Sequence, residues 1–371
     1  MLNKIKTNRV IVDTQAIRFN ISELKKLIGQ KKFYAVVKAD AYGLGSVEIA
    51  KRIDDLVDGY CVSSIFEALE IREVSQKEIL NLGYTQLQEV ETAALKKISI
   101  AIYDLAYAKK IDEILKEKSL KLIGHIKIDT GHGRLGFRKS KEALDEIVEV
   151  SKLSNIKLEG IFSHLATADE DDDKHTFDQK EIFDFMIKAL EDRGLYFDLK
   201  HLANDAGFIK YDFTYDLVRS GICLYGSYPS KLLEEEGQVQ LKNTFSWLSK
   251  VSFVKYIEKG ASISYGRTFT APRRMKIATI AVGYADGYKR SNSNKAYVLI
   301  KGKKAPVLGR VTMDQTMVDV SYIDDVEIGD DVVLVGQSGD LCLTPDDLAL
   351  WSDTICYEIM TSISKRVHRI Y

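Results

Sequence analysis

Lys38 lies directly after an apolar run, FYAVV, in the segment FYAVVKADAYGLG. A lysine that leaves an apolar strand for a pocket has a lowered pKa, because burial disfavours the charged ammonium form. Its neutral amine is then a nucleophile for a carbonyl compound. The alternative is a lysine at a strand end whose charged group reaches solvent. Lys38 is therefore the first candidate for covalent chemistry.

Two later segments carry groups that suit a phosphate. The segment ANDAG follows the seventh apolar run of the chain, and RSGICLYG, which begins at Arg219, follows the eighth. Cations and free backbone N–H groups bind phosphate, and barrel proteins often place a phosphate in the loops after strands seven and eight. An amine together with a phosphate site is what pyridoxal phosphate (PLP) requires. The sequence therefore predicts a PLP site anchored by Lys38.

A competing motif lies at residues 131–136, where GHGRLG matches the G-x-G-x-x-G of dinucleotide-binding proteins. Glu159 follows at about the spacing that this motif requires. However, the preceding run carries Lys127, and Arg134 lies inside the turn. A nicotinamide-dependent dehydrogenase is therefore the weaker alternative.

His164 is the one histidine that we single out, because it follows the sixth apolar run in SHLATAD. Its alternative role is that of a hydrogen-bonded structural residue. The six histidines contain no H-E-x-x-H or other metal-ligand spacing, so no metal is predicted. The four cysteines contain no C-x-x-C pair, which is typical of reduced thiols.

The elements that must position these residues are eight short apolar runs, which alternate with segments of helical periodicity. The runs span residues 33–38, 59–63, 79–82, 98–102, 123–128, 158–162, 199–202 and 217–219. Eight such units predict an α/β fold with a (β/α)8 TIM-type barrel, and an open doubly wound sheet is the alternative. The active residues of a barrel lie at the carboxyl ends of its strands.

The pattern changes after residues 228–240, which contain Pro229 and the acidic run 234–236. Beyond this point the runs are short, β-branched and separated by glycines, with few helical patterns before Pro345. We predict a PLP-binding barrel domain over residues 1–242 and a C-terminal, mainly β domain over residues 243–371. Residues 1–13 can pack with the β domain.

The overall composition excludes several classes of protein. The chain has 371 residues and a formal net charge of -1, so neither nucleic acid nor a membrane surface is an expected partner. The sequence contains no apolar run of signal-peptide or membrane-spanning length. These features predict a cytoplasmic protein.

Seven motifs now allow a comparison with known families. They are AVVKADAYGLG, DTGHGRLG, SHLATAD, RSGICLYG, SYGRTF, GYADGY and GRVTMDQ, in this order. Together they resemble the bacterial alanine racemase family, from about Arg9 to Arg369. The resemblance implies a PLP-dependent isomerase that interconverts L- and D-alanine and supplies D-alanine for peptidoglycan. It also implies a homodimer, in which each active site lies between the barrel of one subunit and the β domain of the other.

The resemblance assigns two bases and the groups that hold the substrate. Lys38 binds the cofactor and exchanges the α-proton on the D side, and Tyr265 of the partner subunit acts on the L side. Arg134 and the backbone N–H of Met313 contact the substrate carboxylate, and Tyr284 lines the entrance. Two bases are expected, because racemisation removes a proton from one face of a planar carbon and returns one to the other.

The resemblance also assigns the cofactor contacts. Arg219 faces the pyridine nitrogen and keeps it unprotonated, because an arginine does not release its proton. This weakens the cofactor as an electron sink and disfavours side reactions such as transamination. His164 links Tyr265 to Arg219. The phosphate contacts are Tyr42, Gly221, Ile222 and Tyr357, and Asn204 and Asp205 are further cofactor-binding residues.

Three residues raise questions within this pattern. The family usually has a serine in place of Asp205, and an ionised aspartate repels phosphate, so we expect its side chain to turn away or a water or cation to intervene. His132 replaces a frequent methionine, and filling space is favoured over tuning Arg134. Lys127 is expected to point into the barrel near Arg134 and to carry a carbamate, which would pair with the arginine.

Three other functions stay open. The first is a racemase of broader range, or one specific for serine, because the pocket walls decide the substrate. The second is a related PLP decarboxylase, although such enzymes lack SYGRTF and GRVTMDQ. The third is a non-catalytic PLP-binding protein, although such proteins lack the β domain.

Overall fold

The computed structural model describes residues 7–371, which form two compact units. The barrel unit comprises residues 17–41 and 46–242. The β unit comprises the described residues 7–16, 42–45 and 243–371. Residues 1–6 of the segment 1–13, which can pack with the β domain in our prediction, lie outside the described residues.

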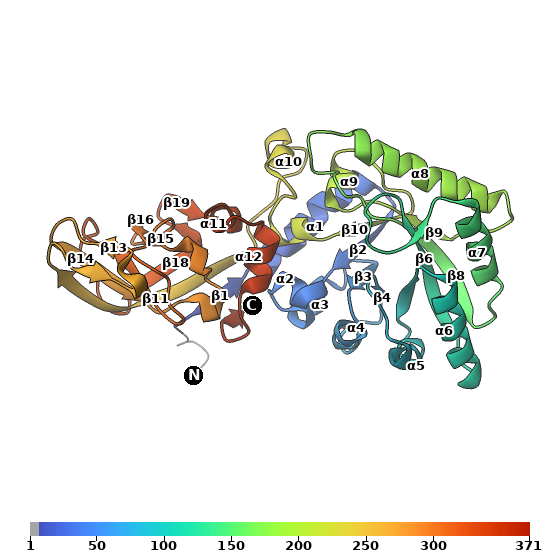
Figure 1. Ribbon diagram of the computed structural model, residues 1–371, viewed down its shortest axis with the longest axis horizontal. Helices are drawn as coiled ribbons and strands as arrows, with labels where there is room; N and C mark the ends of the chain where they lie inside the picture. The colour runs from blue at the N-terminus through green and yellow to red at the C-terminus, as the bar shows by residue number, and fades with distance from the viewer. Residues whose placement is uncertain (1–6) are drawn as a thin grey trace. The chain divides into compact units, whose positions relative to one another are not determined.

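The barrel unit is built on eight parallel strands in the order β10-β2-β3-β4-β5-β6-β8-β9 (Figure 1). They span β2 Lys32–Val36, β3 Gly59–Val62, β4 Glu78–Asn81, β5 Ser99–Ile102, β6 Leu122–Asp129, β8 Ile156–Phe162, β9 Leu199–His201 and β10 Leu217–Ser220. The ring closes between β9 and β10, where Asp216 N donates to Lys200 O at 3.0 Å and Arg219 N to Ala203 O at 3.2 Å. The predicted barrel is therefore confirmed, and the open sheet is excluded.

The helices of the barrel unit begin soon after a strand, often at a residue that caps the helix. Ser64, Asp104 and Ser140 each accept a backbone N–H three residues ahead, which satisfies a free amide of the first turn. The helices are α1 Thr14–Ile28, α3 Ser46–Ile53, α4 Ile65–Arg72, α5 Val90–Leu95, α6 Leu105–Glu117, α7 Lys141–Ser151, α8 Lys174–Glu191, α9 Asp205–Ile209 and α10 Lys231–Glu236. Within residues 7–371, no helix has the length and apolar character to cross a membrane.

The β unit is organised around β11, a strand of 13 residues (Phe245–Ile257) that pairs with β1, β14 and β18. The other strands are β1 Arg9–Val12, β12 Ser262–Ile263, β13 Phe269–Thr270, β14 Met275–Ile280, β15 Tyr297–Ile300, β16 Lys303–Pro306, β17 Thr316–Asp319, β18 Asp331–Ser338, β19 Leu341–Leu343 and β20 His368–Ile370. Its helices are α11 Pro345–Ser352 and α12 Cys356–Ser362. The predicted mainly β character of the C-terminal part is confirmed, and β1 lies between β11 and β20.

Candidate active site

Lys38 begins a left-handed turn, α2 (Lys38–Tyr42), at the carboxyl end of β2. The four residues after Lys38 all have φ between 52° and 56°, and none of them is glycine. Such a conformation costs an L-residue about 1–2 kcal/mol, so other contacts must hold it. Glu67 does so, because its carboxylate accepts Ala39 N and Ser63 N, each at 2.8 Å. The hydrogen bonds of Glu67 therefore hold the left-handed turn that follows Lys38.

The Lys38 side chain borders a cavity of about 230 Å³ at the carboxyl ends of the barrel strands. The lining residues are Lys38, Ser63, Leu82, Gly83, Lys127, Arg134, Leu135, Phe162, His164 and Arg219. This set contains two arginines, two lysines and no carboxylate, so the cavity suits an anionic ligand. Burial first, and then the charge of Arg134, lowers the pKa of Lys38, which favours the nucleophilic amine.

Arg219 lies on β10 and is only 3% exposed. Its guanidinium donates to His201 Nδ1 at 2.6 Å, to Ser163 O at 2.8 Å and to Leu202 O at 3.0 Å. It also lies 3.4 Å from His164 Nδ1, the contact that we expected for His164 within the barrel. Burial lowers the pKa of Arg219 to about 10, so the guanidinium stays charged at neutral pH.

A chain of side chains extends from Arg219 through the barrel interior. Since Arg219 only donates, His201 accepts through Nδ1 and carries its proton on Nε2, which donates to His125 Nδ1 at 3.0 Å. His125 must then present Nε2–H toward Glu159 Oε2, 3.8 Å away. The sequence analysis did not identify His125 or His201 as site residues, although His125 and Lys127 are polar residues at alternate positions of one apolar strand.

Lys127 points into the barrel, as predicted, and is 6% exposed. Its Nζ lies 3.3 Å from Ile128 O and 4.9 Å from the centre of the Phe162 ring. Burial, followed by the charges of Arg219 and Arg134, holds the pKa of Lys127 well below its ordinary value. Within residues 7–371, no carboxylate lies within 4.0 Å of this amine.

Arg134 lies on the turn after β6, which Asp129 organises. The Asp129 carboxylate accepts Gly131 N at 3.2 Å and Gly133 N at 2.9 Å. The turn leads into a short strand, β7 Phe137–Arg138, which pairs with β6. A dinucleotide fingerprint must open a helix, so the dehydrogenase alternative is excluded on structural grounds.

His132 lies on the same turn, and its ring is 5.5 Å from that of His164. Its buried Nδ1 has no hydrogen-bond partner among the described residues. Burial first, and then the charge of Arg134, lowers the pKa of His132. The ring is therefore close enough to sense Arg134 and also fills space beside His164.

Asn204 and Asp205 lie where β9 leads into α9. Asn204 caps α9 by accepting Gly207 N at 3.0 Å. The carboxylate of Asp205 accepts Ser220 Oγ at 2.5 Å, Gly221 N at 2.9 Å and Cys223 N at 3.3 Å. The side chain turns toward the amides after β10, because a buried carboxylate needs donors and these are within reach. Its expected turn away from a phosphate, or an intervening water or cation, stays a prediction. Burial raises the pKa of Asp205 despite these bonds.

The remaining barrel residue in the predicted phosphate set, Ile222, begins the short helix η3 Ile222–Tyr225 and is buried. Two other members of the set, Tyr42 and Tyr357, belong to the β unit. Their rings lie 5.9 Å apart at an angle of 47°. The structure therefore brings each half of the predicted phosphate set together within its own unit.

Three predicted residues lie in one region of the β unit, on neighbouring turns. Tyr265 begins η4 (Tyr265–Arg267), and Ser264 Oγ before it donates to Arg310 O at 2.6 Å. Tyr284 begins η5 (Tyr284–Asp286), where Tyr284 N donates to Thr312 O and Ala285 N to Met313 O, each at 3.0 Å. These bonds gather the segments SYGR, GYAD and GRVTMD.

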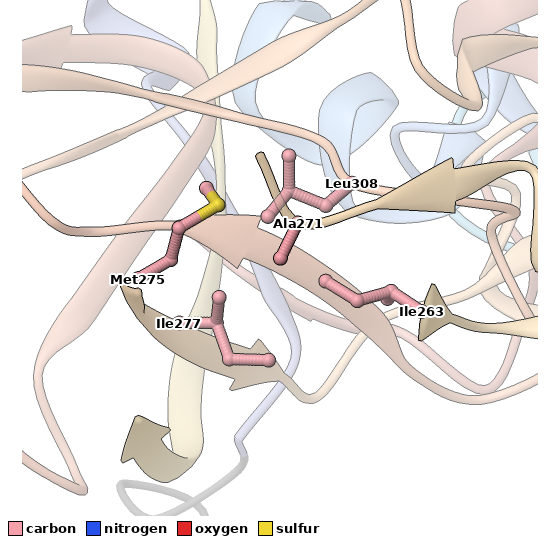
Figure 2. Close-up of a cluster of buried hydrophobic side chains, with 5 residues drawn as sticks. All are labelled: Ile263, Ala271, Met275, Ile277 and Leu308. Carbon is pink, nitrogen blue, oxygen red and sulfur yellow. The ribbon is translucent and has the colours of Figure 1, made fainter. Parts of the chain in front are cut away.

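The same region has its own apolar support. Figure 2 shows Ile263, Ala271, Met275, Ile277 and Leu308 packed as one buried cluster. Ile263 lies two residues before Tyr265, and Leu308 lies five residues before Met313. In contrast, Tyr265 is 71% exposed, Met313 53% and Tyr284 42%. The buried cluster thus supports a region in which three large side chains are exposed in the single chain.

A larger cavity of about 700 Å³ lies at the opposite end of the barrel strands. It is lined by residues at the starts of β4, β5 and β6, including Glu78, Ile98 and Leu122. Chemistry in barrels of this kind occurs at the carboxyl ends, and conservation at this other end reflects stability. The smaller cavity at Lys38 is therefore the candidate site.

A barrel that holds a reactive amine among cations, joined to a mainly β unit, defines a class of two-unit barrel enzymes with anionic ligands. Family models described as the N-terminal and C-terminal domains of alanine racemase match residues 12–229 and 244–371. The chain belongs to the alanine racemase family.

Individual relatives agree with this assignment. The alanine racemase 2 of Caldanaerobacter subterraneus subsp. tengcongensis is 43% identical over the whole chain and 96% of its own length. The alanine racemase of Clostridium perfringens is 41% identical over 97% of this chain and 94% of its own. The structure of alanine racemase from Bacillus anthracis with bound L-Ala-P has a TM-score of 0.94 and 32% identity, covering 99% of this chain and 96% of that one.

Proposed function

We propose that the chain is a PLP-dependent racemase that interconverts L- and D-alanine. One observation carries the proposal beyond family membership: Lys38, whose pKa is lowered, faces a cavity that Arg134 and Arg219 also line and that has no carboxylate in its lining. An amine that binds an aldehyde and cations that bind a phosphate and a substrate carboxylate are what such a reaction requires.

The residues at this cavity fit PLP. When bound, PLP withdraws electrons from the α-carbon of an amino acid and makes its proton acidic. Lys38 would hold the cofactor through its amine. Arg219, which its hydrogen bonds hold in place, would face the pyridine nitrogen. Because an arginine does not release its proton, this nitrogen would stay unprotonated. His164, beside Arg219, has a pKa held well below its ordinary value by burial and by that arginine, so it stays a neutral acceptor.

The proton transfers need a base on each face of the α-carbon. Lys38 is the base of the barrel unit in this proposal, and Tyr265 is the base of the β unit. A tyrosine has an ordinary pKa near ~10 and needs a neutral acceptor beside its phenol, the role proposed for His164. Arg134 and the Met313 N–H would hold the substrate carboxylate and so fix which face each base meets.

The exposure of Tyr265, Tyr284 and Met313 supports the proposal that two copies of the chain form each site. In a symmetric dimer, the same surface of each copy would cover the barrel opening of the other. Tyr284 would then line the entrance. The dimer would be required for activity because each copy would lack a base without its partner.

Chiral chromatography of products from a panel of L-amino acids, with PLP added, tests the proposal. We expect D-alanine from L-alanine, deuterium at the α-carbon when the solvent is D₂O, and neither with Lys38→Ala. A larger product yield from L-serine than from L-alanine would assign a different substrate. If borohydride fixes PLP on Lys38 but no α-proton exchanges, the chain would instead be a non-catalytic PLP-binding protein.

A further inference from the structure

Asp205 has a buried carboxyl group in an unusual environment. The residue is 5% exposed, and its two carboxylate oxygens accept the Ser220 hydroxyl and the amides of Gly221 and Cys223. Within residues 7–371, no lysine, arginine or histidine lies within 4.0 Å of the carboxylate. The carboxyl group is therefore held by neutral donors at the end of β10 and on the turn after it, and not by a cation.

These donors are groups that a phosphate would need. The turn follows the eighth barrel strand, a frequent position for phosphate in such barrels, and the resemblance to the alanine racemase family implies that Gly221 and Ile222 contact the cofactor phosphate. A backbone N–H serves one acceptor well, and Gly221 N already donates to Asp205 Oδ2 at 2.9 Å. A phosphate and an ionised Asp205 would compete for the same donors.

We propose that Asp205 is an internal anion that competes with the cofactor phosphate for the amides after β10, so that the chain distinguishes poorly between PLP and unphosphorylated pyridoxal. The inference rests on the proposed function and deepens it. Asp205 acts as a specificity-determining residue of the cofactor site.

The energetics follow from the balance of buried charges. A phosphate that displaced the carboxylate would leave a buried anion without its three donors, and one that bound beside it would meet a like charge. Pyridoxal carries a hydroxyl group in place of the phosphate, and a hydroxyl can donate to the carboxylate. The phosphate thus loses affinity at Asp205 while the alcohol gains a partner. Both effects reduce the preference of the site for PLP over pyridoxal.

The test measures dissociation constants of PLP and of pyridoxal for the full chain freed of cofactor, by the absorbance of the adduct on Lys38. Both aldehydes react with the same amine, so the ratio of the two constants isolates the phosphate. The variants are Asp205→Asn, which removes the charge at constant shape, and Asp205→Ser, which supplies a hydroxyl donor. Asp169→Asn, in the loop after β8, is the matched control for loss of one negative charge.

We expect the wild-type chain and Asp169→Asn to prefer PLP by less than about tenfold, and both Asp205 variants to prefer it by at least ten times more than the wild type. A wild-type preference above about a thousandfold overturns the inference even if neither Asp205 variant folds. Equal ratios in all four proteins, with both aldehydes fixed on Lys38 by borohydride, also overturn it and leave the proposed function intact. Fixation of neither aldehyde on Lys38 in any of the four proteins overturns both.

Discussion

The surroundings of Lys38 favour the neutral form of its amine. Its amine is partly buried, and the largest charge effect on it comes from the cation Arg134, so burial and repulsion both lower its pKa. Glu67 lies close but binds the Ala39 and Ser63 amides. It therefore fixes the turn, and its charge offsets only part of the lowering of the Lys38 pKa.

Tyr265→Phe tests the proposal that Lys38 and Tyr265 each act as the base on one face of the α-carbon. The substitution keeps the ring and removes the oxygen that carries the proton. We expect conversion of L- to D-alanine to fall by about 10²–10⁴-fold, the usual contribution of a positioned acid or base. Exchange of the α-proton of D-alanine in D₂O should persist, because Lys38 performs it.

Tyr322→Phe is the matched control, since Tyr322 is 75% exposed in the same unit and has no assigned role. Its kinetics should equal those of the wild type. Equal losses of α-proton exchange from both enantiomers in Tyr265→Phe would show that Tyr265 is not a base for one face.

Lys127 offers a second test at the residue scale. Its pKa lies well below the ordinary value, so its neutral amine can add CO₂, forming an N–C bond and releasing one proton. The resulting anion would lie between Arg134 and Arg219. Carbon-13 NMR after addition of labelled bicarbonate should give a carbamate signal in the wild-type chain and none in Lys127→Arg. The absence of a signal from the wild type would mean that Lys127 stays a plain amine.

The sequence could indicate the types of the site residues better than their contacts. Lys38, Arg219 and His164 follow apolar runs, which places them at strand ends without knowledge of any distance. The bond between His125 and His201 joins residues 76 positions apart and depends on the ring of strands. The orientation of Asp205 likewise depends on amides after β10 that only the closed barrel brings near.

At the scale of elements, the eight apolar runs predicted the eight barrel strands to within a residue or two of their observed ends. Buried parallel strands are continuous apolar runs, which makes them visible in a sequence. The left-handed turn α2 was not predictable in the same way, because ADAY has no glycine to signal positive φ. Glu67, 28 positions from Ala39, holds that turn through tertiary contacts.

Strand β8 makes room for the histidine chain at Gly160. A Cβ at this position would stand 2.2 Å from His125 Nδ1. Gly160→Ala should therefore lower stability by about 1–3 kcal/mol, the usual cost of overpacking, seen as a lower Tm. In Gly160→Ala/His125→Ala the clash is absent, so the double variant should lose less stability than the two single variants lose together. Strict additivity would contradict the contact.

Glu159, at the outer end of this chain, makes stability depend on pH. The imidazole of His125, 3.8 Å from the Glu159 carboxylate, makes the largest contribution that lowers the pKa of Glu159 to about 2. A lowered folded pKa adds stability above the unfolded pKa of about 4.3, and this stability disappears as the pH falls toward 2. Glu159→Gln should cost on the order of 2 kcal/mol at pH 7 and lose its disadvantage in acid, as measured by Tm against pH. A constant difference in Tm across this range would refute the linkage.

At the scale of the whole molecule, the chain divides the proposed chemistry between two units. The barrel unit holds Lys38, Arg219 and the cationic cavity. The β unit holds Tyr265, Tyr284 and Met313 on a surface that is open in the single chain. The sequence predicted both groups of residues, but no residue pattern states which copy of the chain supplies the tyrosine.

The most direct test of the account combines two inactive variants, Lys38→Ala and Tyr265→Phe, by expressing them together. In a symmetric dimer with shared sites, a mixed dimer has one site with both changes and one site with neither. If half of the dimers are mixed, about one quarter of the wild-type rate of D-alanine formation should return, although each variant alone is inactive. A mixture as inactive as its components would contradict the account, because it would place both bases in one copy of the chain or outside the reaction.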